Sequence, residues 1–324
     1  MPTTITKTIK PSGGDYTSLS AWEAGMQKNL VTADEISVAE CYSMQDTASV
    51  SVDGWTTDST RYIYIYTPGS ERHDGKYNTS KYRLETSGNN VLEIPEDYVR
   101  VKGLQIVLTG ADSSNTRRAV YSQTGTTSDR RIEECVIKDL GSGTATRTGI
   151  EALYGTIYLY NNIVYDFKDY GINSYWWSSA TWYVYNNTVY GCGLGINRSG
   201  GDTVYLKNNL CNSNTTDYSG TFTNATTNLS EDATSPNTAL RNKAVTFVDE
   251  AGDDFHLASS DTNAKDAGTD LSADSDSPYD ISMDIDGVTR SGTWDIGADE
   301  YVAAGGLSIP IAQYYYQHNI GSGV

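Results

Sequence analysis

The stretch TIYLYNNIVYDFKDYGIN at residues 156–173 returns as TWYVYNNTVYGCGLGIN at residues 181–197. Its first half returns once more as DTVYLKNNLCNSN at residues 202–214. Two earlier stretches, RRIEECVIKDL at 130–140 and YVRVKGLQIVL at 98–108, fit the same frame. Successive copies lie 31, 27, 25 and 22 residues apart. Self-similarity with a period of this size is typical of a solenoid, here one whose loops shorten along the chain.

The aligned copies share apolar columns that predict a common core. Apolar and polar residues alternate around each column, so the period is two and the elements are strands rather than helices. Short strands between Asn, Gly, Asp and Ser turns cannot bury their apolar faces alone, whereas stacked turns can. The columns are Val101, Ile132, Leu159, Val184 and Leu206; Ile106, Ile137, Val164, Val189 and Cys211; and Ile150, Ile172 and Ile196, each preceded by glycine.

Between the first two columns lies a mixed column that becomes asparagine in the later copies. It contains Leu104, Cys135, Asn162, Asn187 and Asn209. Asparagine at the same place in consecutive turns predicts a ladder of side-chain amides, as in other stacked β-structures.

The repeat I-x-N-N-x-[IV] followed by G-I resembles the loose repeats of right-handed parallel β-helix proteins of the pectate-lyase-like superfamily. The resemblance covers roughly residues 60–230 and concerns the fold rather than an activity. It implies an all-β, right-handed parallel β-helix, with RYIYIYTP at 61–68 as an earlier turn. Members of this kind include bacteriophage fibres, tailspikes and capsid-decorating proteins.

The two ends read as caps. Residues 15–30 predict a short amphipathic helix, with Ser18 or Ser20 as its N-cap, and EISVAECYS at 35–43 predicts the first strand. Residues 249–300 hold 15 acidic and 2 basic side chains, and DIDGVTRSGTWDIGADEY at 284–301 resembles a closing motif of β-helix proteins. The expected division is therefore an N-terminal cap with first strands (1–60), β-helix repeats (61–230), acidic C-terminal rungs with the closing motif (231–302), and an uncharged docking tail (303–324).

The composition argues against some classes of binding partner. A net charge of −18 argues against nucleic acid or an anionic membrane surface as the main partner. The sequence shows no apolar run of membrane-spanning length and no secretory signal, so we expect no membrane insertion. The four cysteines lack metal-ligand spacing and suit a chain that folds in a reducing cytosol.

Aromatic residues fill the outward positions beside the core columns. If the register is right, tyrosines stack on adjacent turns about 4.8 Å apart. Flat rings of this kind bind sugar faces or anchor a protein interface, and they also occur simply as cross-strand packing. The expected ligand-binding residues are Tyr158, Tyr160, Trp176, Trp177, Tyr183, Tyr185 and Tyr205.

The acidic closing motif offers a metal site. Asp284, Asp286 and Asp295 supply the hard oxygen ligands that Ca²⁺ prefers. The spacing is not that of an EF-hand, and the alternative is a turn whose aspartates cap backbone amides.

Acidic residues on the middle turns are candidates for catalysis. Glycoside hydrolysis needs two carboxylates about 5 to 9.5 Å apart. The sequence offers Glu151, Asp166, Asp169 and Asp202, but no spacing singles out a pair, and we expect no catalytic constellation.

The tail, AAGGLSIPIAQYYYQHNIGSGV, contains no Asp, Glu, Lys or Arg. Its Tyr314, Tyr315 and Tyr316 are the expected interface residues, because an uncharged aromatic extension favours association. The tail either docks on a neighbouring subunit or caps the last turn.

Two functions of different classes follow. The first is a non-enzymatic structural or adhesive protein of a phage particle, assembled in the host cytoplasm. Its partners would be other virion proteins or copies of itself, as in a homotrimer, together with a host surface polysaccharide. The alternative is a secreted or cell-surface polysaccharide lyase or glycoside hydrolase. A surface protein without activity differs from the first mainly in its export.

Overall fold

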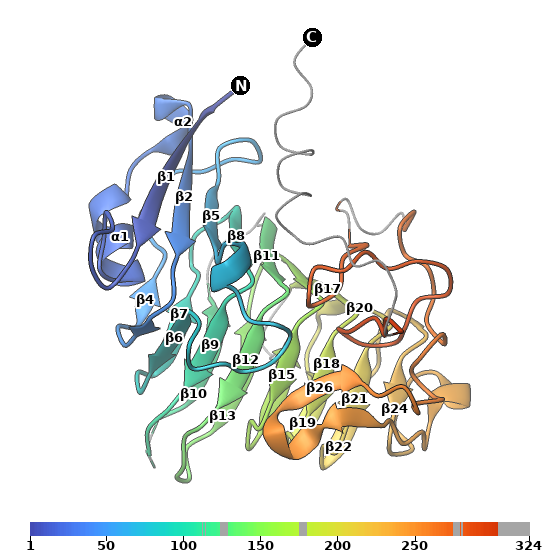
Figure 1. The fold of residues 1–324 in the computed structure, drawn as a ribbon. Coiled ribbons are helices and arrows are strands. Elements are labelled where there is room, and N and C mark those ends of the chain that lie inside the picture. Colours follow the sequence, from blue (N-terminus) through green and yellow to red (C-terminus); the bar gives the residue numbers. More distant parts are fainter. Residues whose placement is uncertain are drawn as a thin grey trace.

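The computed structural model describes residues 1–303 except 112, 114, 124–128, 175–179, 275–278 and 280. The chain winds into a parallel β-helix whose turns stack along one axis, with three long parallel sheets as its faces (Figure 1). Connections between successive parallel strands of one sheet are right-handed in nearly all proteins. The expected right-handed parallel β-helix is therefore confirmed.

Sheet A contributes nine strands in the described part of the chain. In spatial order they are β1 (Thr3–Ile9), β2 (Glu35–Cys41), β5 (Ile63–Tyr66), β8 (Val99–Lys102), β11 (Asp129–Glu133), β14 (Thr156–Tyr160), β17 (Thr181–Tyr185), β20 (Thr203–Lys207) and β23 (Asn224–Thr226).

Sheets B and C complete each turn. Sheet B consists of β3 (Gln45–Asp46), β6 (Arg83–Thr86), β9 (Gln105–Leu108), β12 (Val136–Asp139), β15 (Ile163–Tyr165), β18 (Thr188–Tyr190), β21 (Leu210–Asn212) and β24 (Leu229–Ser230). Sheet C consists of β4 (Val50–Ser51), β7 (Asn90–Glu93), β10 (Arg117–Ser122), β13 (Arg147–Ala152), β16 (Tyr170–Ser174), β19 (Leu194–Arg198) and β22 (Thr216–Ser219).

The strand register matches the sequence columns. Val101 pairs with Ile132, Ile132 with Leu159, and the column continues through Val184 to Leu206. These residues are buried in one core that runs the length of the helix. Stacking is what buries them, because each turn covers the apolar edge of the turn before it.

The asparagine ladder forms at the bend between sheets A and B. The Nδ2 group of Asn162 donates to Asn187 Oδ1 at 3.0 Å, and that of Asn187 donates to Asn209 Oδ1 at 3.1 Å. Two further residues, Asn228 and Asn237, continue the ladder with donations at 2.8 and 3.1 Å. Each Oδ1 also accepts the backbone N–H of the preceding turn's ladder residue, so the ladder satisfies backbone groups inside the core.

The residue before each ladder position has a left-handed backbone. Asn161, Asn186 and Asn208 all have φ of 54°. Asparagine tolerates this conformation better than other residues with a side chain, which explains the repeated Asn-Asn pair.

The N-terminal cap contains helix α1 (Leu19–Met26) and a single turn, α2 (Leu30–Ala33). Ser18 is the N-cap, and its side chain accepts the N–H of Ala21. The expected strand at 35–43 is β2, but it is the second strand, because β1 pairs with it over seven residues. The sequence TTITKTI of β1 belongs to an edge strand and carries no column that could have identified it.

The acidic segment 231–302 forms no parallel rung beyond β24 among its described residues, so the expectation of further rungs is wrong. Instead it returns along the outer faces of sheets A and B (orange and red in Figure 1). It contains the antiparallel pair β25 (Phe247–Asp249) and β26 (Asp254–Leu257). Short 3₁₀ turns complete the structure: η1 (Gly69–Glu71), η2 (Thr238–Leu240) and η3 (Glu250–Gly252).

Arg290 anchors the returning segment to the ladder bend. Its side chain is fully buried, and its Nη2 donates to the carbonyls of Gly297 at 2.8 Å and Ala298 at 2.9 Å and to Asn161 Oδ1 at 3.3 Å. Glu300 pairs with the same guanidinium at 3.2 Å. The Arg and Glu of the closing motif are therefore explained by this contact.

No helix among the described residues is long and apolar enough to cross a membrane.

Replacing Asn187 by alanine tests the ladder. The change removes the amide that accepts the Asn162 N–H and donates to the carbonyl of Leu159 at 2.9 Å. Leaving these groups buried and unpaired is expected to lower the free energy of unfolding by about 2–4 kcal/mol. Chemical denaturation measures the loss. Asn224→Ala, on exposed β23, is the matched control and should change stability by less than about 0.5 kcal/mol. Equal stability of both variants would contradict the ladder's role.

Candidate functional site

The tyrosine row on sheet A has the predicted register. Tyr158 pairs with Tyr183, and Tyr183 with Tyr205. Their rings stack with centroids 4.9 Å apart at each step and interplanar angles of 11° and 3°. The row therefore lies on one outward face, as the alignment predicts.

The row is covered by the chain's own C-terminal segment. Tyr160 is 1% exposed and Tyr185 is fully buried, and both pack against Leu271, Ile281 and Trp294. Because these two rings are buried, they are not open to a ligand, which corrects the expectation for Tyr160 and Tyr185. The sequence does not show that the acidic segment folds back over sheet A. The aromatic residues alone therefore could not predict that this segment packs on them.

Three partly buried rings of the row, Tyr158, Tyr183 and Tyr205, pack against the same cluster. Tyr279 meets Tyr158 edge-on, with centroids 5.0 Å apart. The remaining expected binding residues, Trp176 and Trp177, and the expected interface residues, Tyr314, Tyr315 and Tyr316, lie outside the described residues.

The acidic residues on the middle turns are dispersed. Asp202 is buried and accepts hydrogen bonds from Ser174 Oγ at 2.5 Å, the Ala180 N–H at 2.7 Å and Trp182 Nε1 at 2.9 Å. Such a carboxylate organises its own turn. Asp166 faces Lys138 at 3.8 Å on the bend after sheet B, and Asp169 accepts the backbone N–H of Arg147 at 2.9 Å. Of these four carboxylates, Glu151 lines a cavity.

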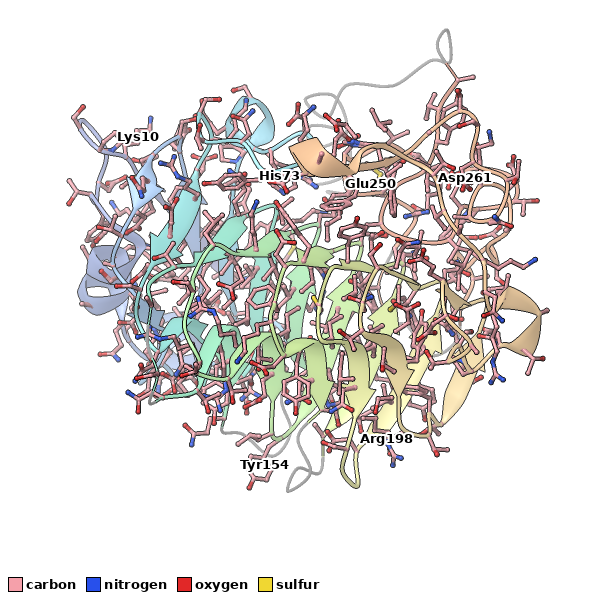
Figure 2. All side chains as sticks on the ribbon, turned by 90° about the horizontal axis from the view of Figure 1, so that it is seen from below. Lys10, His73, Tyr154, Arg198, Glu250 and Asp261 are labelled. Carbon is pink, nitrogen blue, oxygen red and sulfur yellow. The ribbon has the colours of Figure 1, made fainter. Side chains whose placement is uncertain are left out.

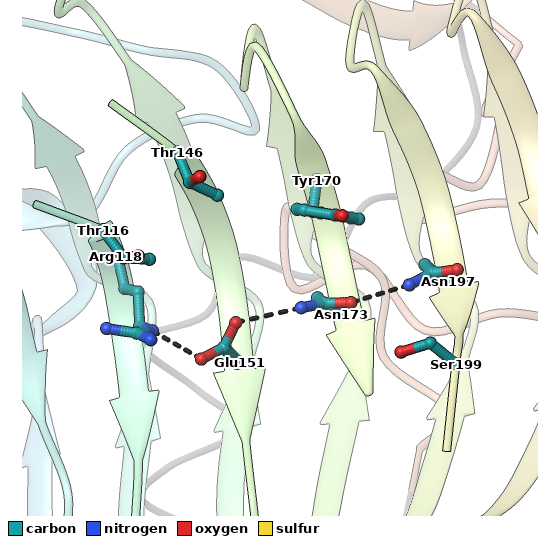
Figure 3. A pocket seen from close by; sticks show the side chains of 8 residues that line it. All are labelled: Thr116, Arg118, Thr146, Glu151, Tyr170, Asn173, Asn197 and Ser199. Atoms are coloured by element: carbon teal, nitrogen blue, oxygen red, sulfur yellow. Dashed lines mark hydrogen bonds and ion pairs between the residues drawn. The ribbon is translucent and has the colours of Figure 1, made fainter. Parts of the chain in front are cut away.

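That cavity is a groove on the outer face of sheet C, with a volume of about 420 Å³, which we call the sheet C groove (Figure 3). It lies away from the returning segment. Figure 2 places Tyr154 and Arg198, at the ends of sheet C strands, opposite Glu250 and Asp261. The described residues that line the groove are Thr116, Arg118, Thr146, Glu151, Tyr170, Asn173, Asn197 and Ser199.

A row of hydrogen bonds crosses four strands at the floor of the groove. Arg118 Nε donates to Glu151 Oε1 at 2.6 Å, and Asn173 Nδ2 donates to Glu151 Oε2 at 2.9 Å. Asn197 Nδ2 in turn donates to Asn173 Oδ1 at 2.8 Å. Figure 3 shows this row running from β10 through β13 and β16 to β19. The guanidinium of Arg118 also lies over the ring of Tyr121, 4.1 Å from its centroid.

The register of sheet C creates this row. Glu151 pairs with Asn173, and Asn173 with Asn197, each directly after an isoleucine of the inward column. The glycine before each isoleucine is required by close approach: a Cβ at Gly149, Gly171 or Gly195 would lie 2.4, 2.8 or 2.6 Å from a backbone oxygen of the next turn. The triplets Gly-Ile-Glu and Gly-Ile-Asn are the sequence signal for this site, although the glycines and isoleucines by themselves predict only a core column.

Chemically, the groove offers fixed hydrogen-bonding groups rather than a pair of free carboxylates. Glu151, Asn173 and Asn197 are 3%, 4% and 6% exposed, so their orientations are set by their neighbours. Both oxygens of Glu151 already accept hydrogen bonds. Within the described lining, Glu151 is the one carboxylate and Arg118 the one cation. The arrangement can bind a polar ligand, with hydroxyls and amides repeating from turn to turn.

The aspartates expected to bind Ca²⁺ have different surroundings. Asp284 is buried, and its carboxylate accepts the backbone N–H groups of Asp286 and Val288, at 2.9 and 2.7 Å. Burial raises the pKa of Asp284 to about 8. Asp295 accepts the N–H groups of Asp266 and Tyr301, both at 2.6 Å, and burial raises its pKa to about 6. Asp284 and Asp295 therefore cap backbone amides, which is the alternative to a Ca²⁺ site given above.

Asp286 belongs to a different group. Its Oδ2 contacts His256 Nε2 at 2.9 Å, and Asp254 binds the other ring nitrogen. Possible ligand atoms of His256, Asp286 and Asp299 lie within 4.8 Å of one another, whereas Asp284 and Asp295 belong to no such group among the described residues. Burial lowers the pKa of His256, but its hydrogen bond with Asp286 and the nearby carboxylates outweigh this and raise it to about 10. The imidazolium itself therefore balances the acidic cluster.

No family model and no curated protein matches the chain. Among solved structures, the chain is similar to the crystal structure of pectate lyase Pel9A, with 14% identity and a TM-score of 0.41 over 93% of this chain and 97% of that chain.

The stability of the returning segment is expected to fall as pH rises. Burial raises the pKa of Asp299 to about 6, and Asp284 and His256 also bind protons more tightly when folded than their ordinary values of 3.8 and 6.5 allow. A raised pKa stabilises the fold below the unfolded value, and that stabilisation is lost as pH passes the folded value.

Between about pH 6 and pH 10 the titration of Asp284 and His256 should therefore lower the free energy of unfolding by at least about 2 kcal/mol. Thermal unfolding across this range measures the effect. His256→Gln should give a flatter profile, because it removes one of the two titrations. A stability that is constant or rises from pH 6 to pH 10 would show that these protons are not held by the fold.

Proposed function

We propose that this chain is a non-enzymatic structural or adhesive protein of a virus particle that binds an extracellular glycan through the sheet C groove. The observation that carries the binding role is the row from Arg118 to Asn197, whose side chains are hydrogen-bonded to one another and held in place. Preorganised polar groups lose little conformational entropy when a ligand binds. Their repetition on consecutive strands suits an extended polymer laid along the axis.

The chemistry of the groove favours binding over cleavage. Hydrolysis of a glycosidic bond needs an acid and a second carboxylate about 5 to 9.5 Å away. Glu151 is the one carboxylate of the described lining, and Arg118 and Asn173 occupy its oxygens. A carboxylate held in this way orients its neighbours.

The virion role rests on features outside the groove. The returning segment packs on apolar residues of the outer faces of sheets A and B, and the two parts share buried clusters. A net charge of −18 would keep many copies on one particle from associating through these faces. In this proposal the tail with Tyr314, Tyr315 and Tyr316 docks on other virion proteins or on a second copy, and the molecule is located in the virion. A secreted or cell-surface location is the alternative.

Glycan binding can be tested with the full chain on a polysaccharide array, followed by calorimetry on the polymers retained. Asn173→Ala and Asn197→Ala should each weaken binding about tenfold, because each removes ordered hydrogen bonds from the groove. Asn224→Ala, on exposed β23 of sheet A, should bind as the wild type does. Failure of every polymer to bind, or loss of affinity in the control alone, would overturn the proposal.

The enzymatic alternative predicts a different readout in the same samples. A polysaccharide lyase or glycoside hydrolase releases oligosaccharides from the retained polymer, and a Glu151→Gln variant of such an enzyme stops releasing them. We expect the polymer to be recovered intact. Products that depend on Glu151 would replace the adhesive role by an enzymatic one.

A further inference from the structure

Given the proposed glycan binding, we infer that the ligand of the sheet C groove is a neutral glycan, rather than one that carries uronate or sulfate groups. The inference begins with charge. The described lining contains one cation and one anion, Arg118 and Glu151, and these two are joined at 2.6 Å. The Glu151 side chain is 3% exposed and that of Arg118 18%, so water screens this pair poorly. The positive charge that an anionic ligand requires is already balanced.

The remaining lining is neutral and bifunctional. Asn173 and Asn197 contribute amides, and Thr116, Thr146, Tyr170 and Ser199 contribute hydroxyls. Each of these groups can donate and accept hydrogen bonds, which is also true of a sugar hydroxyl. A carboxylate or sulfate only accepts hydrogen bonds, so it would use half of this capacity and would meet the acceptor oxygens of the row.

The field of the whole chain acts in the same direction. With 41 acidic and 23 basic side chains, the protein repels a polyanion before contact. Long-range repulsion of this kind slows association and weakens with added salt. A neutral polymer is unaffected by it, so the groove can bind such a polymer from within an acidic molecule.

Glu151 is therefore the residue that decides selectivity. Replacing it by glutamine keeps the shape and an acceptor for Arg118 Nε but leaves the guanidinium without its counter-charge. A freed arginine is well suited to bind a carboxylate through two parallel hydrogen bonds. The variant should accept uronate polymers that the wild type rejects.

The test uses polymers that differ in oxidation at C6: a mannan against a polymannuronate, and a galactan against a polygalacturonate. Calorimetry with the wild type should show binding to at least one neutral member, with less than a twofold change in affinity between about 50 and 500 mM salt. Glu151→Gln should bind the matching uronate at least about tenfold more tightly than the wild type does. Asp166→Asn removes an acid outside the described groove lining and should leave the selectivity unchanged.

The outcomes separate the two levels of the proposal. Wild-type binding to a uronate polymer, weakened by salt, would overturn the neutral-ligand inference and leave glycan binding intact. Binding to no polymer would overturn the proposed function. Because the selectivity of the wild type decides by itself, the inference is tested even if Glu151→Gln unfolds, which thermal unfolding of the variant would reveal.

Discussion

The buried amide ladder at the bend between sheets A and B sets the geometry of the rest of the molecule. Each ladder asparagine accepts hydrogen bonds from the preceding turn and donates to the next, so a turn that slipped by one residue would leave several buried polar groups unpaired. Such a slip would also move every side chain to the opposite face of its sheet. The ladder thus fixes the register that stacks Tyr158 on Tyr183 and, on sheet C, places Asn173 beside Glu151.

Because the columns are fixed, each sheet repeats the same kind of side chain along its outer face. These outer faces differ in whether the C-terminal segment covers them. The outer positions of sheet B include the apolar Val136, Ile163 and Leu210, which would be costly to expose. The returning segment covers them together with the tyrosine row of sheet A. The groove on sheet C, whose floor carries Glu151 and asparagines, is left open. The position of the sheet C groove follows from which face the C-terminal part leaves uncovered.

The repeats predicted the β-helix, its register and the ladder, because stacking requires the same residue type at the same place in every turn. Strand β1 was missed because an edge strand of threonines has no column to match. The fold-back of residues 231–302 was also missed. It depends on contacts such as the N–H of Gly297 with the carbonyl of Asn208, in which both partners are backbone groups that leave no sequence signal.

The sequence predicts only part of the candidate site, for a similar reason. The sequence shows Glu151 as an acid, yet the role of Glu151 depends on Arg118, which lies one turn earlier in a repeat with a longer loop, outside the aligned columns. The repeats predict a surface of stacked tyrosines, but a repeat cannot show that a segment far along the chain covers that surface. Sequence columns predict which side chains are neighbours within the solenoid. They do not predict which faces meet a non-repeating segment.

Stacking also limits which charges a β-helix can place in its columns. Strands lie about 4.8 Å apart, so a charged side chain in a column is partly desolvated by its neighbours above and below. The described structure balances such charges in pairs, as Arg147 with Asp139 and Arg118 with Glu151 show. The neutral groove is a consequence of this constraint, since an arginine packed into the row without a carboxylate would destabilise the turn that carries it. A fold that builds its binding face from stacked columns therefore favours neutral, hydroxyl-rich ligands unless unpaired cations are supplied by its loops.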